Sequence, residues 1–554
     1  MRIIFYFYII SFLFININEI LIEWEVISIN STNIQLIFIL DNISISFLFL
    51  VRLISGRVII FSTSYIISEK FFSRFILLVF FFIISIFLLI LSPNLIRLLL
   101  GWDGLGVTSY LLVVFYQSNK SYNAGILTAI TNRLGDVGLL ISISFILYIG
   151  NWNYIYINSF SNVFSNLLVY LIIISACTKR AQIPFSAWLP AAIAAPTPVS
   201  ALVHSSTLVT AGVYLLIRIN LIIIEININY LLLIIGIITI VIAGITAIME
   251  IDIKKIIALS TLSQLGIIIL ILGIGNPILS YFHLLSHAFF KAMLFICAGI
   301  VIHNIKDYQD IRKIGIRYNN LDFCISIILI ANISLCGLPF LRGFYSKDLI
   351  IEILIIKGKN IFIFFFIIFG TRLTVIYSCR LNFLVSINFL KSEPLYFISE
   401  NSIFMIFGII FLLPFSIMGG MIISWNIINI TKLVYLPIWI KFSVMFIILF
   451  SISLFYIIFI KLANYKNNIF IWFFSNMWFL PMSINISLTK INLNLSNFFF
   501  KFVEIRWSEI FIFNFYSNYI NNNIIRKFLD YLSYIYIIQI IEIFIIIFIF
   551  LILL

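Results

Sequence analysis

Apolar stretches long enough to cross a membrane recur along most of the chain, roughly every 25–30 residues, which is one span plus a short connection. Polar connections at residues 117–122, 151–158 and 306–320 separate them. The stretches are continuous, as in residues 75–91 and 537–554, and do not alternate with polar positions as barrel strands do. This pattern predicts an all-α polytopic membrane protein with about 15–16 transmembrane helices.

The two ends of the chain have their own patterns. Residues 1–15 have the apolar character of a signal peptide, but no small-residue cleavage motif follows, so we expect a first transmembrane helix. Residues 481–523 mix asparagines and charges with apolar positions such as Phe498 and Phe502. This mixture favours an amphipathic segment along a membrane or partner surface, before a final span at residues 534–554.

Two proline-containing segments interrupt the helical pattern. The first begins at Lys179 and runs into Pro184, and the second contains Gly337 and Pro339. Proline removes a backbone donor, and free backbone groups at membrane depth require a protein or water environment. Broken helices in two halves of a chain are typical of an ion path, although loops at the membrane surface also explain them.

Composition narrows the class of protein. Of 554 residues, 63% are hydrophobic and only 10% are charged, whereas the surface of a soluble domain requires far more charge. The net charge of +13 does not indicate nucleic-acid binding, because lysines and arginines of polytopic proteins lie in loops and at helix ends. We therefore expect a lipid bilayer around the chain and no nucleic acid.

The sequence contains no pattern that is typical of a cofactor site. Its five cysteines include no CxxC pair, its four histidines form no HExxH, and no complete GxGxxG occurs. We expect no metal, nucleotide, flavin or iron–sulfur cluster in this chain, so that other subunits carry any electrons that move in its assembly.

Ionisable residues inside apolar stretches are candidates for function, since a charge at the bilayer centre costs roughly 3 kcal/mol or more. Asp103 has long apolar runs on both sides. Asp136 follows Arg133 by three residues, so a neutralised pair on one helix face explains it equally well. Lys179 and His204 flank the first break. A buried lysine near carboxylates can take up and release a proton, whereas His204 by itself is more typical of a hydrogen-bonded core histidine.

The strongest signal is a row of titratable residues in an apolar segment. His283, His287 and Lys291 are spaced four apart, which places them on one helix face with about 6 Å between neighbours. A row of proton carriers explains this spacing better than packing does. Lys347 and Asp348 follow the second break; we predict Lys347 as the terminal proton site, whereas a surface salt link also explains Asp348.

Several motifs resemble those of one membrane-protein family. That family is the antiporter-like family, which includes the large proton-pumping subunits of respiratory complex I and subunits of multi-subunit cation/proton antiporters. The similar stretches are GWDGLG at 101–106, NRLGD at 132–136, WLP at 188–190, APTPVSALVHSST at 195–207 and SHAFFKA at 286–292. GLP at 337–339, GFYSKD at 343–348 and the amphipathic C-terminal segment point to the branch with a long lateral helix rather than to its paralogues, chains 2 and 4.

The resemblance implies a fold and a proton path. The fold has two inverted five-helix repeats with a broken helix in each, around a hydrated axis of charged residues. The path pairs Asp103 with Lys179, and continues through His204 and the histidine–lysine row to Lys347 and Asp348. The expected domains are N-terminal transmembrane helices (1–92), a first repeat (93–250), a second repeat (251–390), further transmembrane helices (391–465), the lateral segment (466–533) and the C-terminal span (534–554).

The resemblance also implies a function and partners. The chain is expected to be a core subunit of proton-translocating NADH:ubiquinone oxidoreductase in the mitochondrial inner membrane, beside the antiporter-like chains 4 and 2. NADH, flavin, iron–sulfur clusters and ubiquinone are then bound by other subunits. A stand-alone cation/proton antiporter subunit is the alternative, and sodium-dependent flux would favour it. A purely structural scaffold is a third interpretation, which the histidine–lysine row opposes.

Some positions depart from the family. Asp103 stands where many members have glutamate, and Arg57, Arg180, Arg342 and Arg372 stand where they usually have a small residue. Four extra guanidiniums in a membrane are costly, and the chain has only 9 methionines. We hypothesise that the reading frame was translated with the wrong mitochondrial code, which gives arginine for serine and isoleucine for methionine.

This hypothesis predicts serine at positions 57, 180, 342 and 372 of the native protein. Peptide mass spectrometry of the protein from its natural membranes checks the prediction directly. Arginine at position 180 in the native peptide would contradict it.

Overall fold

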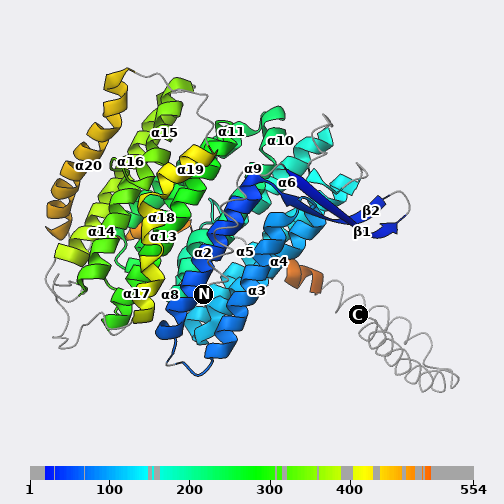
Figure 1. Cartoon of the computed structure of the whole chain (residues 1–554), viewed down its shortest axis with the longest axis horizontal. Coiled ribbons are helices and arrows are strands. Elements are labelled where there is room, and N and C mark those ends of the chain that lie inside the picture. The colour runs from blue at the N-terminus through cyan, green and yellow to red at the C-terminus, as the bar shows by residue number, and fades with distance from the viewer. Residues whose placement is uncertain are drawn as a thin grey trace. The chain divides into compact units, whose positions relative to one another are not determined.

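The computed structural model describes the greater part of the chain, and the described residues are 19–29, 32–67, 69–147, 152–154, 163–305, 308–312, 314, 321–357, 361–387, 403–427, 437–464, 469–480, 490 and 493–500 (Figure 1). Residues 1–481 and 482–554 form two separate compact units. The predicted first span, most of the predicted lateral segment and the predicted final span lie outside the described residues.

The described residues are mainly helical, which confirms the all-α polytopic prediction. Within them, nine helical segments are long and apolar enough to cross a membrane. These are α2 (Asn42–Tyr65), α3 (Phe72–Leu91), α4 with η2 (Leu95–Tyr116), α5 (Asn119–Leu147), α8, η5 and α9 (Thr197–Arg218), α11 (Asn229–Met249), α12 (Ile253–Gly273), α13 (Pro277–Asn304) and α16 with η6 (Phe362–Ser386).

Shorter elements complete the first unit. They are α6 (Val163–Lys179), α7 (Trp188–Ala191), η4 (Ala192–Ala194), α10 (Asn220–Glu225), α14 (Asp322–Cys336), α15 (Arg342–Lys357), α17 (Ile403–Ile410), α18 (Leu413–Ile417), α19 (Gly419–Ile427), α20 (Ile438–Asn464), α21 (Ile469–Ser475) and η7 (Met477–Phe479). Within the central continuous helix, α8 spans Thr197–Val199, η5 spans Ser200–Thr207 and α9 spans Leu208–Arg218.

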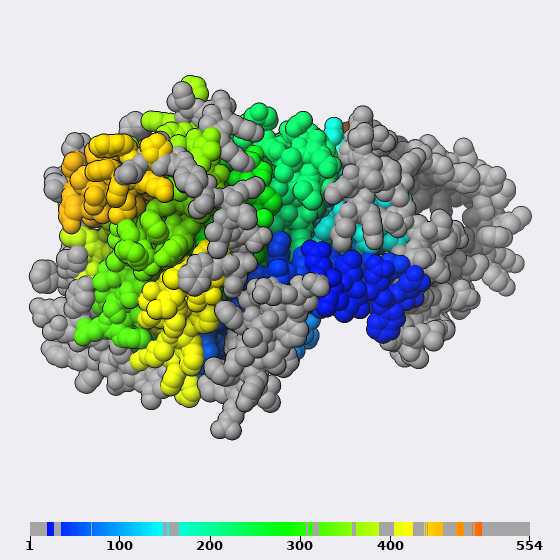
Figure 2. Space-filling model, turned by 45° about the horizontal axis from the view of Figure 1, so that its top comes forward, coloured from blue at the N-terminus to red at the C-terminus, as the bar shows by residue number. Residues whose placement is uncertain are grey.

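An antiparallel β-hairpin lies where the sequence analysis expected only transmembrane helices. Strands β1 (Ile20–Ile29) and β2 (Thr32–Leu40) pair directly before α2. The physical reason is the local alternation of Glu23 and Glu25 with Ile22, Trp24 and other apolar residues, which is a strand period inside an apolar stretch. The hairpin lies on the surface of the first unit (Figure 2, dark blue), and Trp24 is 70% exposed.

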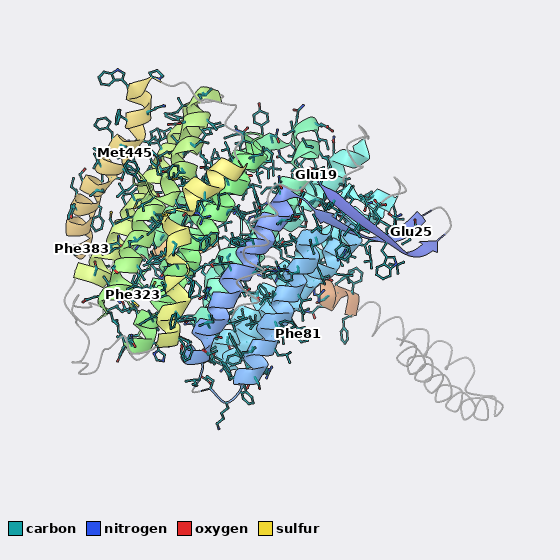
Figure 3. The ribbon with its side chains drawn as sticks, viewed as in Figure 1. Glu19, Glu25, Phe81, Phe323, Phe383 and Met445 are labelled. Carbon is teal, nitrogen blue, oxygen red and sulfur yellow. The ribbon has the colours of Figure 1, made fainter. Side chains whose placement is uncertain are left out.

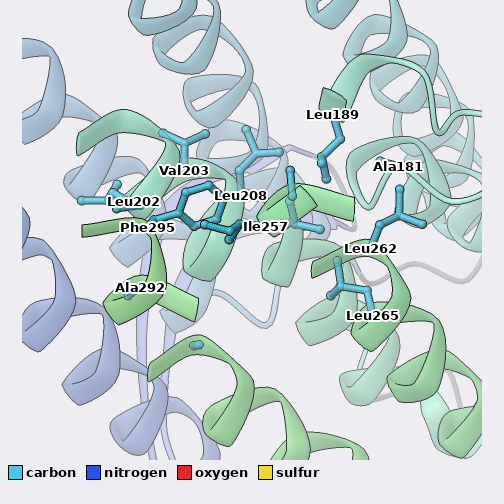
Figure 4. Packing of buried hydrophobic residues seen from close by; sticks show 14 of the residues in the cluster. Ala181, Leu189, Leu202, Val203, Leu208, Ile257, Leu262, Leu265, Ala292 and Phe295 are labelled. Carbon is cyan, nitrogen blue, oxygen red and sulfur yellow. The ribbon is translucent and has the colours of Figure 1, made fainter. Parts of the chain in front are cut away.

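Three helical segments form the interior of the first unit. The spans Thr197–Arg218, Ile253–Gly273 and Pro277–Asn304 are buried along their whole apolar length. Figure 4 shows Leu202 and Val203 of η5 gathered with Ile257 of α12 and Phe295 of α13 in this core. Helix α13 packs against α12, α14, α15, η5 and α2, so it is in contact with both halves of the bundle. His283, His287 and Lys291 on α13 are therefore shielded from lipid by protein.

Peripheral helices show the opposite pattern. On α3, Leu77, Phe80 and Phe81 are exposed, although the other face of the helix packs in the core. Of these three residues, Phe81 is labelled in Figure 3. Exposed phenylalanine and leucine side chains on a helix of spanning length are typical of a lipid-facing surface. The exposure pattern thus fits a bundle whose outer helices meet the acyl chains.

Both predicted helix breaks are present. Helix α6 ends at Lys179; residues 180–182 and Trp188 that follow are buried, whereas Pro184 between them is exposed, so the first break starts inside the protein and reaches its surface at Pro184. Helix α14 ends before Gly337, whose φ of 90° is a conformation that glycine adopts without strain. At the second break Phe340 is 84% exposed, so this segment reaches the surface before α15 re-enters the core.

An ion pair joins the start of α2 to the end of α9. Arg218 donates from both Nη atoms to the Asp41 carboxylate, with 2.7 Å between Nη2 and Oδ1, and it also donates to the Tyr214 hydroxyl. Asp41 caps α2 by accepting from the Ser44 backbone. Burial by itself raises the pKa of the Asp41 carboxyl, but the hydrogen bonds and charge of Arg218 outweigh burial and hold it below its ordinary value.

We predict that Asp41→Asn destabilises the purified protein by about 3 kcal/mol, because it leaves a nearly buried guanidinium without its charge partner while asparagine still caps the helix. The same stabilisation in the native chain is lost as the pH falls through the lowered pKa of Asp41. Thermal unfolding in detergent measures both effects. Asp310→Asn, which removes an exposed pair with Arg312, is the control and shifts unfolding by less than about 1 kcal/mol; equal effects of the two variants would contradict the prediction.

Candidate functional site

Lys179 lies at the end of α6, fully buried beside α4. Its Nζ atom donates to the carbonyl oxygen of Trp102 at 2.6 Å and stands 4.6 Å from the centroid of the Trp102 ring. Trp102 is itself fully buried. A backbone carbonyl and an aromatic face thus replace water around the ammonium group.

Two carboxylates of the first half, Asp103 and Asp136, influence this lysine without a direct contact. Asp136 and Asp103 both act on Lys179 electrostatically, yet among the described residues neither forms an ion pair with it within 4.0 Å. The Asp103–Lys179 pair that the resemblance implied is therefore not a direct contact in this structure, because Trp102 occupies the position next to Nζ. Asp136 instead contacts Arg133 at 3.5 Å, as one of its two predicted interpretations required, and Arg133 is 65% exposed.

His204 lies in the π-helical stretch η5, which follows the first break after α7, η4 and α8, and is buried. A π-helical stretch widens the helix and is frequent at functional sites. The indole of Trp188 links His204 to Lys179: its Nε1 atom donates to the Thr178 carbonyl at 2.8 Å, and its ring lies 6.2 Å from the imidazole. Trp188 thus fills the space between the two predicted relay residues.

The predicted row on α13 is present and completely buried. Lys291 donates to the Ser260 hydroxyl of α12. The two ring nitrogens of His287 have no hydrogen-bond partner within the described part of the chain, although the edge of its ring meets Phe290 at 5.6 Å. A buried imidazole with free nitrogens is a site for water, since an unsatisfied polar group in an apolar interior is unfavourable.

His283 has partners on two neighbouring helices. Its Nε2 atom lies 3.1 Å from Gln264 Oε1 of α12, and its Nδ1 atom lies 3.1 Å from the Ser346 hydroxyl of α15. Ser286 donates to the same hydroxyl at 3.1 Å. The row on α13 is therefore connected by hydrogen bonds to the segment that follows the second break.

Lys347 is buried next to this contact. Its Nζ atom donates to the Thr374 hydroxyl of α16 at 2.8 Å and to the Cys336 carbonyl at 3.3 Å. Asp348 is only 7% exposed, and the described residues offer it no salt bridge, so the predicted surface salt link is not what holds it. Both residues lie in the protein interior at the second break.

The four arginines that depart from the family differ in burial, and Arg57 and Arg372 are partly buried. Arg180 and Arg342 are fully buried. Both Nη atoms of Arg180 are without a hydrogen-bond partner among the residues that the structure describes, and its side chain crowds Gly212. Arg342 reaches only backbone carbonyls and the Phe289 ring. A serine at position 180 would remove this uncompensated charge, which agrees with the mass-spectrometric prediction.

Several polar residues of the site were not predicted from the sequence. Five of them supply a hydroxyl, amide or backbone carbonyl to a predicted ionisable group, and the sixth, Trp188, donates to the Thr178 carbonyl beside Lys179; the six are Trp102, Trp188, Ser260, Gln264, Ser346 and Thr374. The four-residue spacing of Ser260 and Gln264 in an apolar helix was a weak signal that both lie on one face. The others depend on contacts between distant segments. In the described residues no group of three histidine, cysteine or carboxylate side chains is placed to hold a metal ion.

Family models match the chain over nearly its whole length. Residues 92–374 match the model described as NADH:quinone oxidoreductase/Mrp antiporter, TM. Residues 24–76 match the NADH-ubiquinone oxidoreductase (complex I), chain 5 N-terminus, and residues 377–554 match the NADH dehydrogenase subunit 5 C-terminus.

Individual proteins agree with these models. The chain is 45% identical to NADH-ubiquinone oxidoreductase chain 5 of Aedes aegypti over 533 residues, which covers 92% of this chain and 91% of that protein. It is 47% identical to the protein of the same name from Locusta migratoria, over 88% of this chain and 86% of that protein.

Solved structures show the same fold at low identity. The Mrp complex from Dietzia sp. DQ12-45-1b matches with a TM-score of 0.69 and 21% identity, over 90% of this chain and 57% of that chain. An archaeal membrane-bound sulfane sulfur reductase matches with a TM-score of 0.63 and 19% identity, over 74% of this chain and 83% of that chain. With its buried lysine and histidine row in an antiporter-like bundle, the chain belongs to the NADH-ubiquinone oxidoreductase chain 5 family, the proton-translocating membrane subunits of complex I.

Proposed function

We propose that this chain moves protons across the mitochondrial inner membrane through its row of buried ionisable side chains, as a core subunit of NADH:ubiquinone oxidoreductase. The observation that carries the proposal is the set of Lys179, Lys291 and Lys347, which are all buried in the bundle without a carboxylate salt bridge in the described residues. Each has hydroxyl or carbonyl acceptors in place of a counter-ion.

Buried lysines without a direct counter-ion suit proton transfer. A direct ion pair in a low-dielectric interior holds the proton too firmly for repeated transfer, whereas a neutral acceptor leaves the charge sensitive to small changes nearby. Moving one charge against 100 mV requires about 2.3 kcal/mol. One pKa unit corresponds to about 1.4 kcal/mol, so a movement of Asp103 or Asp136 that shifts the pKa of Lys179 by about two units is enough to load and unload it.

The proposed path runs through the interior of the bundle. It begins at Asp103, Asp136 and Lys179, passes His204 across Trp188, and continues along His283, His287 and Lys291 to Lys347 and Asp348. The hydrogen bond between His283 and Ser346 supports a connection across the second break. Free polar atoms on His287 and on Gln182, among the described residues, support hydration along the path.

Partners and cofactors follow from membership of the family. Other subunits of the enzyme are partners of this chain, and we propose chains 4 and 2 as its antiporter-like neighbours. NADH, flavin, iron–sulfur clusters and ubiquinone are then held by other subunits, which drive proton movement here through conformational coupling. A stand-alone cation/proton antiporter would instead require sodium-dependent flux through the isolated chain.

Lys179→Ala is expected to lower NADH-driven proton pumping at least about tenfold, since general acid–base groups contribute factors of this size or larger. Inside-out membrane vesicles that carry the variant in an assembled complex allow pumping and NADH oxidation to be measured together. The control is Lys70→Ala, which removes an exposed lysine. Full rates of both pumping and oxidation would mean that the charged row is not the path through this chain.

Lys291→Ala tests the central row in the same vesicles. Loss of the ammonium group leaves the Ser260 hydroxyl without its charged donor, so we expect pumping to collapse while assembly on native gels persists. Full pumping with this variant would favour a purely structural scaffold.

A further inference from the structure

The Ser346 hydroxyl that contacts His283 also has two other hydrogen-bonding neighbours. Ser346 is fully buried in the first turns of α15, next to the predicted terminal lysine Lys347. Its hydroxyl lies 3.1 Å from His283 Nδ1, 3.1 Å from the Ser286 hydroxyl and 3.3 Å from the Gly343 carbonyl oxygen. One hydroxyl therefore has two acceptors and one donor within reach.

Gln264 determines which nitrogen of the neutral ring carries hydrogen. Its Oε1 atom accepts at 3.1 Å, so Nε2 is the protonated nitrogen and Nδ1 is free to accept from Ser346. If His283 gains a proton, it binds at Nδ1, and Nδ1 becomes a donor that requires an acceptor. Ser346 is the group that faces it.

We propose that Ser346 is a two-state hydrogen-bonding partner that lets the buried His283 hold and release a proton. With the ring neutral, the Ser346 hydroxyl donates to Nδ1. With the ring charged, Nδ1–H donates to the Ser346 oxygen, and the hydroxyl hydrogen turns to the Gly343 carbonyl. No bond of Ser346 forms or breaks; the transferred proton stays on Nδ1, and only the O–H direction changes. This inference rests on the proposed proton path.

The backbone places Ser346 for this role. A Cβ atom at Gly343 would lie 1.7 Å from the Ser334 carbonyl oxygen, so only glycine allows the start of α15 to approach α14 this closely. The close approach sets the Gly343 carbonyl and the Ser346 hydroxyl at their places beside α13. Lys347 is the next residue and acts electrostatically on His283, so the state of the ring is felt at the following group of the path.

The groups facing His283 come from each element packed around it. Helix α12 contributes Gln264, α13 contributes Ser286 and His287, and α15 contributes Ser346 and Lys347. In the described residues no carboxylate contacts the ring, so a hydroxyl is what remains to accept from the charged form. Alanine at position 346 removes this acceptor and cysteine replaces it with a much weaker one, and the charged ring suffers more than the neutral ring because charge-assisted hydrogen bonds are the stronger ones.

The experiment compares Ser346→Ala and Ser346→Cys with Ser334→Ala, in vesicles carrying the assembled complex. Ser334 is equally buried and bonds only to its own helix at Ala331, so it is a matched control. We expect both Ser346 variants to lower proton pumping about fivefold and to move its pH profile to lower pH, because more protons are then needed to charge His283. The control keeps the native rate and profile.

Gln264→Glu is expected to shift the pH profile of pumping in the opposite direction. A carboxylate facing Nε2 favours the charged ring, so the pH profile of pumping moves to higher pH. Cysteine keeps a small, weakly hydrogen-bonding side chain at position 346, so the Ser346→Cys variant carries the test if the alanine variant does not assemble. An unchanged pH profile in the Ser346 variants, with or without a lower rate, overturns the proposal and leaves Ser346 a packing residue.

The failure of this inference differs from the failure of the proposed function. If Lys291→Ala abolishes pumping while the Ser346 variants keep the native profile, the path stands and only the two-state contact fails. If Lys291→Ala pumps at the native rate, the path itself is wrong, and the Ser346 variants are expected to show no shift.

Discussion

A charge inside a bilayer has to be enclosed by protein, and this requirement explains how the bundle is arranged. The spans that carry His204 and the α13 row, together with α12, are buried over their most apolar stretch, whereas α3 and other peripheral helices expose phenylalanine and leucine. The ionisable groups therefore lie where lipid does not reach them. Their surroundings are hydroxyls, carbonyls and aromatic rings, which stabilise a proton without fixing it.

Irregular helix geometry occurs next to several of the titratable side chains, where backbone carbonyls are free to accept hydrogen bonds. The first break ends α6 at Lys179, and the π-helical stretch η5 carries His204. The second break lets Lys347 reach the Cys336 carbonyl at the end of α14. In each case the backbone departs from regular α-helical geometry next to a titratable side chain, as expected where an ion path crosses an interrupted helix.

The buried lysines have different surroundings in the first half and in the centre of the bundle. Lys179 has two carboxylates in its electrostatic neighbourhood and a tryptophan in contact, whereas Lys291 donates to a serine on the next helix. The first half thus places a lysine among negative charges, and the centre relies on neutral hydrogen-bonding partners. In the proposed path, a perturbation that moves the carboxylates of the first half acts on Lys179, whose charge they influence.

The class of the protein, the two breaks and the candidate proton carriers could all be predicted from the amino-acid sequence. Long apolar runs, prolines in apolar surroundings and a four-residue spacing of His283, His287 and Lys291 are local properties of the chain. The sequence did not reveal the β-hairpin at 20–40, because a short alternation inside apolar stretches is hidden by the general hydrophobicity.

The partners of each charge, in contrast, depend on the tertiary fold. It put Trp102 rather than Asp103 against Lys179, joined Asp41 to Arg218, and set Gln264 and Ser346 on either side of His283. These contacts connect segments on different helices, and which faces meet depends on packing among several helices at once. Single-chain periodicity tells which residues share a face, whereas the neighbour of that face is fixed by the fold as a whole.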